Sequence, residues 1–262
     1  MAPLPESVLE PVLESVLRTG VLIRHNLLLM VREPGPVLSR MVLPLVFLTL
    51  LRPLYLAAQG PGAGTEQAVA GTLVTFSLLA LSISGSAILT ERLAGTWDRL
   101  RAAPLRAAEL LVGKAVPVFA ALLAQQLLIV GCGVLAFGLT VRHPLLLAGV
   151  LLCWSGTLLG MGALFGVLAR SMGELSAAFD IGGMLLSSLG GALVPLSVLP
   201  RWVADAAPAS PGYWAVRGLH AALAGDARTS FTACVTLLAV ALACGTLASL
   251  RLRGRSGRLV AV

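Results

Sequence analysis

The chain has 262 residues, of which 57% are hydrophobic and only 12% are charged, and its mean hydropathy is +0.92. A soluble domain of this length needs a larger polar surface, so the composition excludes an ordinary soluble protein and indicates a membrane protein. The net charge of +7 would suggest nucleic-acid binding in a soluble protein, but in a membrane protein it is typical of basic residues that flank the spans. We therefore expect a lipid bilayer, and no nucleic acid, as a partner.

The N-terminal region, residues 1–36, is predicted to form an amphipathic helix that lies in the membrane interface. Apolar residues recur there at helical spacing, and charged residues occupy the opposite side. Pro34 and Pro36 should end this helix. Residues 37–262 then form the transmembrane domain.

Five long stretches of this domain contain no Asp, Glu, Lys or Arg. They are 20 to 27 residues long and cover residues 67–90, 115–141, 143–169, 181–200 and 229–250. About 20 apolar residues cross a bilayer core as a helix, whereas barrel strands are shorter and alternate between apolar and polar residues. A further span precedes them and carries two arginines. Together with it, the five charge-free stretches predict an all-α integral membrane protein with six transmembrane helices. These are expected at residues 37–58, 68–90, 115–139, 145–168, 176–197 and 230–250.

Three positions inside the predicted spans are charged. Arg40 and Arg52 lie in the first span, where long side chains can reach the two interfaces. Asp180 lies in the fifth span, about one turn beyond Glu174. Asp180 and Arg52 are candidates for an intramembrane polar site, in which Asp180 lines a cavity or pairs with Arg170. The alternative is that Asp180 is a charge near the interface at the start of its helix.

Glycines predict close contacts between spans. Gly156, Gly160, Gly162 and Gly166 recur along the fourth span at the spacing of helix-packing residues. The fifth span contains further glycines, including Gly190 and Gly191, that favour either close packing or a helix break.

The basic residues predict the orientation. If the N-terminus lies in the cytoplasm, 13 of the Lys and Arg residues outside the spans are on the cytoplasmic side and four are on the outer side. This bias is typical of cytoplasmic loops. We therefore expect both termini in the cytoplasm and a multi-pass location in the bacterial inner (plasma) membrane.

Two segments between the spans are unusual. Residues 91–114 are long, charged and compatible with a helix up to Pro104. Residues 190–226, called the proline-rich segment below, carry prolines with aromatic residues between them, which predicts short interfacial or half-membrane helices at the outer surface. Its expected gate or half-helix residues are Pro195, Pro200, Trp202, Pro211 and Trp214.

The sequence shows no recognisable catalytic site. Gly113-Lys114 lacks the preceding glycine of a phosphate-binding loop, so ATP binding through such a loop is excluded. The three histidines are scattered, and no serine or cysteine is placed with a base. We expect no catalytic residue, no metal and no cofactor bound by this chain.

Residues 91–114 also carry a motif. The pattern is E-R-x-x-G-T-x-[ED]-x-L-x-x-x-P-[LIV], and it is filled by Glu91, Arg92, Gly95, Thr96, Asp98, Leu100, Pro104 and Leu105. The motif resembles the cytoplasmic loop of type 2 ABC-transporter permeases, the daunorubicin-resistance and polysaccharide-export class. The proline-rich segment, with Pro195-Leu196-Ser197 and Ser210-Pro211, resembles the extracellular segment of that family. Arg52 departs from the family, which more often has an apolar or aromatic residue there.

The resemblance implies a function. The chain would be the permease of an ATP-driven exporter for a drug, an antibiotic, a lipid or a lipid-linked glycan. It would work with an ABC ATP-binding subunit, which holds ATP and Mg, and with a second permease protomer in a homodimer or heterodimer. The loop would contain the coupling helix, with Glu91, Arg92, Gly95, Thr96, Asp98, Leu100 and Pro104 at the ATPase contact. Alternatives are a non-transporting sensor or partner subunit and, with fewer supporting residues, a membrane-embedded lipid-modifying enzyme.

Overall fold

The structure is a computed structural model that describes residues 6–32, 34–93 and 107–256. Within these ranges the chain is helical and contains no strand, so the predicted all-α class is confirmed. The helices are α1 (Glu6–Arg32), α2 (Pro34–Gln59), α3 (Pro61–Leu79), α4 (Leu81–Leu93), α6 (Ala107–Phe137), α7 (Pro144–Leu168), α8 (Met172–Leu189), η1 (Leu196–Val198), α9 (Arg201–Ala206), η2 (Ala207–Ala209), α10 (Pro211–Ala224) and α11 (Ala227–Ser256).

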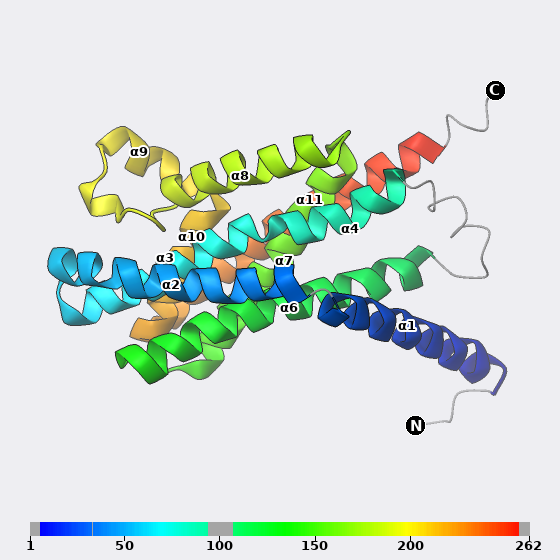
Figure 1. Cartoon of the computed structure of the whole chain (residues 1–262), viewed down its shortest axis with the longest axis horizontal. Coiled ribbons are helices and arrows are strands. Elements are labelled where there is room, and N and C mark those ends of the chain that lie inside the picture. The colour runs from blue at the N-terminus through cyan, green and yellow to red at the C-terminus, as the bar shows by residue number, and fades with distance from the viewer. Residues whose placement is uncertain (1–5, 33, 94–106, 257–262) are drawn as a thin grey trace.

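The long helices form an elongated bundle with two distinct ends (Figure 1). At one end, called the loop end, α4 finishes, α6 begins and α11 finishes, and α1 extends away from the bundle there. At the other end, called the α9 end, lie the α2–α3 connection and α9. The described helix ends that adjoin the loop 91–114 and the C-terminal segment therefore lie at the same end of the molecule.

Five helical stretches are long and apolar enough to cross a membrane. They are Leu38–Gln59, Pro61–Thr90, Val112–Phe137, Pro144–Leu168 and Ala227–Arg251. In the 18-residue apolar window of Pro61–Thr90, 71% of the residues are buried, against 17% in the windows of the first and the last stretch, so Pro61–Thr90 lies at the centre of the bundle. The fifth predicted span corresponds to α8, which is not among these stretches; it has 18 residues, including Glu174 and Asp180.

The second predicted span is divided into two helices. A turn at Ala80 separates α3 from α4, and the Ala80 amide donates to the Phe76 carbonyl at 3.0 Å. α3 also begins earlier than the predicted residue 68, because the φ angle of +84° at Gly60 turns the chain sharply from α2. The one-residue turn interrupts the helix only locally, and α3 and α4 together form the apolar stretch Pro61–Thr90 that contains the second predicted span.

Helix α8 ends at Leu189, so the predicted boundary at residue 197 is wrong. Gly191 has a φ angle of +76°, which side chains rarely allow, and the chain leaves the helix axis at this point. Of the two readings of Gly190 and Gly191, the helix break is the one that the structure shows.

The glycines of α7 permit close helix contacts, as predicted. A Cβ atom at Gly160 would lie 2.6 Å from the carbonyl oxygen of Ala241 on α11. At Gly166 it would lie 2.5 Å from the carbonyl oxygen of Gly85 on α4. Gly156 faces open space, so three of the four glycines, including Gly162, form contacts that any side chain would prevent.

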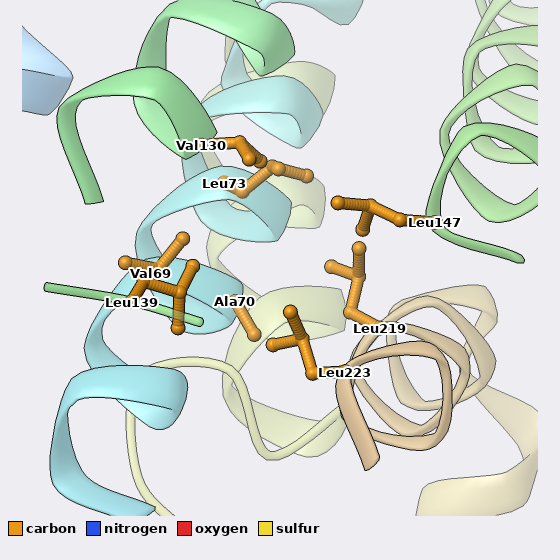
Figure 2. Close-up of a pocket in the computed structure, with 8 residues that line it drawn as sticks. All are labelled: Val69, Ala70, Leu73, Val130, Leu139, Leu147, Leu219 and Leu223. Carbon is orange, nitrogen blue, oxygen red and sulfur yellow. The ribbon is translucent and has the colours of Figure 1, made fainter. Parts of the chain in front are cut away.

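The core of the bundle is mainly apolar, with some buried polar side chains. Trp154 and Phe179 are its largest fully buried side chains. Between α3, α6, α7 and α10 remains an apolar cavity of about 10 Å³ (Figure 2). It is lined by Val69, Ala70, Leu73, Val130, Leu139, Leu147, Leu219 and Leu223. A space of this size and chemistry holds at most one water molecule, so it is a packing gap rather than a binding site.

Candidate functional site

The predicted ATPase contact lies at the loop end. Glu91 and Arg92 belong to the last turn of α4, although their side chains lie outside the described part of the structure. Gly95, Thr96, Asp98, Leu100 and Pro104 lie outside the described residues. The coupling helix therefore stays a prediction, and what the structure shows is how the helices on either side of the loop are held.

Helix α4, which precedes the loop, packs tightly against α7 and α8. A Cβ atom at Gly85 would lie 2.8 Å from the Phe179 ring of α8, and one at Gly162 would lie 2.4 Å from the Cβ of Ser84. The Ser84 hydroxyl donates to the Leu159 carbonyl at 3.3 Å. Because these contacts leave no space between the helices, a displacement of α4 must move α7 and α8 as well.

Helix α6, which follows the loop, is bound at its start by α1. The Asn26 amide donates to the Gly113 carbonyl at 3.3 Å, and a Cβ atom at Gly113 would lie 2.8 Å from the Cβ of Leu22. The N-terminal helix therefore supports one side of the loop directly.

The proline-rich segment, at the α9 end, forms the predicted series of short helices. Pro195 precedes η1, Pro200 precedes α9, and Pro211 is the first residue of α10. Proline favours these positions because its fixed φ angle suits the first turn and its missing N–H has no partner there. The Ser210 hydroxyl caps α10 by accepting from the Gly212 amide at 3.1 Å.

The two predicted tryptophans of this segment differ in their surroundings. Trp214 donates its indole N–H to the Pro208 carbonyl at 2.9 Å and so connects α10 to η2. Trp202 is 71% exposed on α9, and neighbouring Val198 is 67% exposed. Large exposed apolar side chains at one end of a membrane bundle are typical of contact with the lipid interface.

Side chains of α2 and α3 fasten the start of the proline-rich segment to the bundle. The Gln67 amide nitrogen donates to the carbonyls of Gly191 at 2.9 Å and Ala192 at 3.2 Å. The Tyr55 hydroxyl donates to the Leu193 carbonyl at 2.6 Å. Sequence reasoning missed both residues, although a glutamine in a charge-free apolar stretch was a signal that could have identified Gln67.

A cavity of about 250 Å³ opens beside these contacts. It lies between α3, the chain around η1, and α10, and its lining comprises Gln67, Gly190, Gly191, Pro195, Leu196, Tyr213, Val216, Arg217 and His220. Close backbone contacts define its base, because a Cβ atom at Gly190 would lie 2.7 Å from the backbone of Gly212. Of the predicted gate residues, Pro195 lines this cavity.

The structure does not bring Arg52 and Asp180 together. The Arg52 guanidinium lies 4.7 Å from the ring centroid of Phe137, the last residue of α6. Asp180 is exposed on α8, and no ion pair to Arg170 occurs in the described ranges. Instead, the Arg170 amide donates to the Glu174 carboxylate at 2.8 Å.

Other polar side chains connect the spans. The hydroxyls of Thr75 and Ser187 join α3 to α8, and the Thr157 hydroxyl donates to the Leu237 carbonyl of α11 at 2.9 Å. Among the described residues, no three His, Cys, Asp or Glu side chains gather into a group that could hold a metal. The arrangement therefore comprises helices joined by side-chain contacts, the loop end and a cavity. The joined helices suit the transmission of a movement, and the cavity suits the binding of a ligand.

The comparisons with known proteins agree with this reading. The family model described as ABC-2 type transporter matches residues 18–224, well over half of the chain. The match includes most of α1, the loop 91–114 and almost all of the proline-rich segment. No curated protein matches the chain.

Proposed function

The chain belongs to the ABC-2 type transporter family, and from this premise we propose that it is the permease subunit of an ATP-driven exporter. Membership of this family means that the chain is a multi-pass membrane component of an ABC transporter, and it implies an ABC ATP-binding partner. The cargo we propose is a hydrophobic or amphipathic compound: a drug or antibiotic, a lipid or a lipid-linked glycan.

The observation that carries the proposal is the mechanical connection between the loop end and the α9 end. Helix α4 precedes the loop and packs closely against α7 and α8. Through the turn at Ala80 it continues into α3, whose Gln67 binds the start of the proline-rich segment. ATP binding and hydrolysis by the partner would move the loop, and this chain of contacts would open the proline-rich segment on the outer side.

We further propose that α8 faces a second permease protomer. Asp180 is exposed on α8 beside Ile181, Met184 and Leu185, whose side chains are 64%, 51% and 58% exposed. A carboxylate in the bilayer centre costs at least about 2.5 kcal/mol when it faces lipid, so this face is better covered by protein or water than by acyl chains. Transport would then proceed between the two protomers.

We also propose that the termini are cytoplasmic in a bacterial inner membrane and that α1 lies in the membrane interface. Its side chains Val16, Leu17 and Val21 are 62%, 61% and 68% exposed, while Arg18 pairs with Glu14 at 2.8 Å. Such a helix suits the interface between headgroups and acyl chains. It lies at the loop end, where the ATPase would also bind (Figure 1).

Charge reversal at the end of α4 tests the proposal. The variants Glu91→Lys and Arg92→Glu should insert normally but lose both copurification of an ABC ATPase with the tagged chain and export of its cargo. The matched control is Arg142→Glu, which reverses a charge in the connection between α6 and α7. Copurification and export at the wild-type level in both loop variants would contradict the proposed contact.

The alternative functions give different results in the same preparation. A non-transporting partner would bind the ATPase but show no export in reconstituted vesicles. A lipid-modifying enzyme would bind no ATPase and would change the lipids themselves.

A further inference from the structure

The cavity at the α9 end has a single charged side chain in its lining. Arg217 is exposed at the rim, and the lining contains no Asp or Glu. In the described part of the chain Arg217 forms no ion pair. The cavity therefore combines an uncompensated positive charge with a space of about 250 Å³.

The Arg217 side chain is held in place by its neighbours on α10. It donates from Nη1 to the Tyr213 hydroxyl at 2.9 Å, and its guanidinium carbon lies 5.8 Å from the Tyr213 ring centroid and 5.7 Å from that of Trp214. A guanidinium has five N–H donors, so most of them remain for a ligand or for water. Arginine held against aromatic rings is a favourable receptor for phosphate, because its planar donors match two phosphate oxygens.

The inner lining of the cavity is mainly apolar. Leu196 and Val216 provide aliphatic walls, and the Gln67 amide nitrogen is already bound to backbone carbonyls. Pockets for drug-sized molecules measure roughly 300–1,000 Å³. The volume here is smaller, so it suits one part of a larger molecule that continues outside the cavity.

We propose that this cavity binds the headgroup region of an anionic phospholipid. The phosphate would contact the Arg217 guanidinium, and the adjoining aliphatic part would lie along Leu196 and Val216. Val198 on η1 and Trp202 on α9 are exposed as well, so the segment that carries Leu196 also presents apolar side chains suited to lipid. The proposal concerns a resident lipid, so it is measured without the ATPase or the cargo and is independent of the proposed function.

Native mass spectrometry of the purified full chain tests this site. The protein in detergent is mixed with phosphatidylglycerol or with the zwitterionic phosphatidylcholine, and the retained lipid is counted. We expect retention of phosphatidylglycerol over phosphatidylcholine, about tenfold weaker binding in Arg217→Gln, and a smaller loss in Arg217→Lys, which keeps the charge but not the planar donors. Leu196→Trp, which fills the cavity and keeps the charge, should also weaken binding.

The control is Arg201→Gln, which removes an exposed arginine of α9 that does not line the cavity. Equal losses in Arg201→Gln and Arg217→Gln would overturn the proposal, because they would indicate non-specific attraction to the basic surface. Equal retention of both lipids would also overturn it. Inorganic phosphate is added as a separate arm, and its binding without any retention of phosphatidylglycerol would show a free-anion site instead of a lipid site.

Discussion

The buried amide of Gln67 shows how one residue can hold two elements together. It is 3% exposed, and its nitrogen binds the carbonyls of Gly191 and Ala192, where the chain has just left α8. Those carbonyls lack helical partners because α8 ends at Leu189. The side chain of an inner helix therefore satisfies the backbone of the proline-rich segment.

Replacing Gln67 should destabilise the protein. Gln67→Leu leaves the carbonyl oxygens without their donor, and a buried unsatisfied group costs about 1–3 kcal/mol. The matched control is Thr72→Val on the same helix, because the buried Thr72 hydroxyl has no hydrogen-bond partner among the described residues. We expect Thr72→Val to be neutral or stabilising when thermal unfolding is measured in detergent. A similar loss of stability in both variants would contradict the role of Gln67.

Asp226 forms the start of α11. Its Oδ1 atom accepts from the Thr229 amide at 3.1 Å, as in a helix N-cap. Hydrogen bonds from Thr229 hold the pKa of the Asp226 carboxyl below its usual value. A carboxylate with a lowered pKa stabilises the fold at pH values above its unfolded pKa, and that contribution is lost as the pH falls through the lowered folded value.

Replacing Asp226 should therefore have a pH-dependent effect. Asp226→Ala should speed hydrogen exchange in the first turn of α11 at neutral pH, and the difference from wild type should shrink as the pH falls below the usual carboxyl range. Asp226→Asn keeps a capping oxygen, so it should protect this turn at all pH values. A constant difference between Asp226→Ala and wild type down to low pH would exclude the ionised cap.

At the scale of elements, close contacts join the second half of the Pro61–Thr90 stretch to its neighbours. The 24 residues from 67 to 90 contain no proline and no charge, so the sequence predicts an unbroken helix. A one-residue turn at Ala80 interrupts the stretch, and beyond it α4 lies against α7 and α8 through Gly85, Gly162 and Gly166. The stability that this packing contributes depends on glycines of another helix. A local sequence pattern does not reveal that contact.

Adding one methyl group at this contact should disturb it. In Gly166→Ala the new Cβ would lie 2.5 Å from the Gly85 carbonyl oxygen, so the helices must separate, at a cost of typically 1–3 kcal/mol. Gly156→Ala is the control, because that position of the same helix faces open space. We expect a lower unfolding temperature and weaker export for Gly166→Ala and no loss for Gly156→Ala. Equal behaviour of the two variants would show that the close contact is absent in the membrane.

For the whole molecule, the proposed α8 interface predicts which residues of two copies would meet. Ile181 is 64% exposed on this face, whereas Phe231, which is 72% exposed, lies on α11. If α8 faces the second protomer, the side chains of Ile181 from two copies come close together. Phe231 would then face lipid.

Cysteine crosslinking in membranes tests this arrangement. In a background in which the four native cysteines are replaced, Ile181→Cys should give a crosslinked dimer with a short bifunctional reagent. Phe231→Cys should remain monomeric on the same gel. Dimer formation from Phe231→Cys alone would place the interface on α11 and contradict the proposed role of α8.

Sequence and structure agree best where the signal is local. The prolines at positions 195, 200 and 211 correctly predicted a series of short helices, because proline acts on its own backbone. The structure places Arg52 beside Phe137 and leaves Asp180 exposed on α8, and the role of either residue as an intramembrane polar site stays a prediction. The sequence also did not reveal the cavity, whose lining comes from α3, the chain around η1, and α10.

The sequence by itself determined that the protein is an all-α membrane protein, where the main apolar helices lie, and that it resembles ABC permeases, which the family model confirms. These features depend on hydropathy and on motifs of neighbouring residues. Only the tertiary structure decided the break at Ala80, the bonds of Gln67, the exposure of Asp180 and the cavity beside Arg217. Each of these depends on which faces of distant helices come into contact, and in an almost uniformly apolar chain many faces have nearly the same composition.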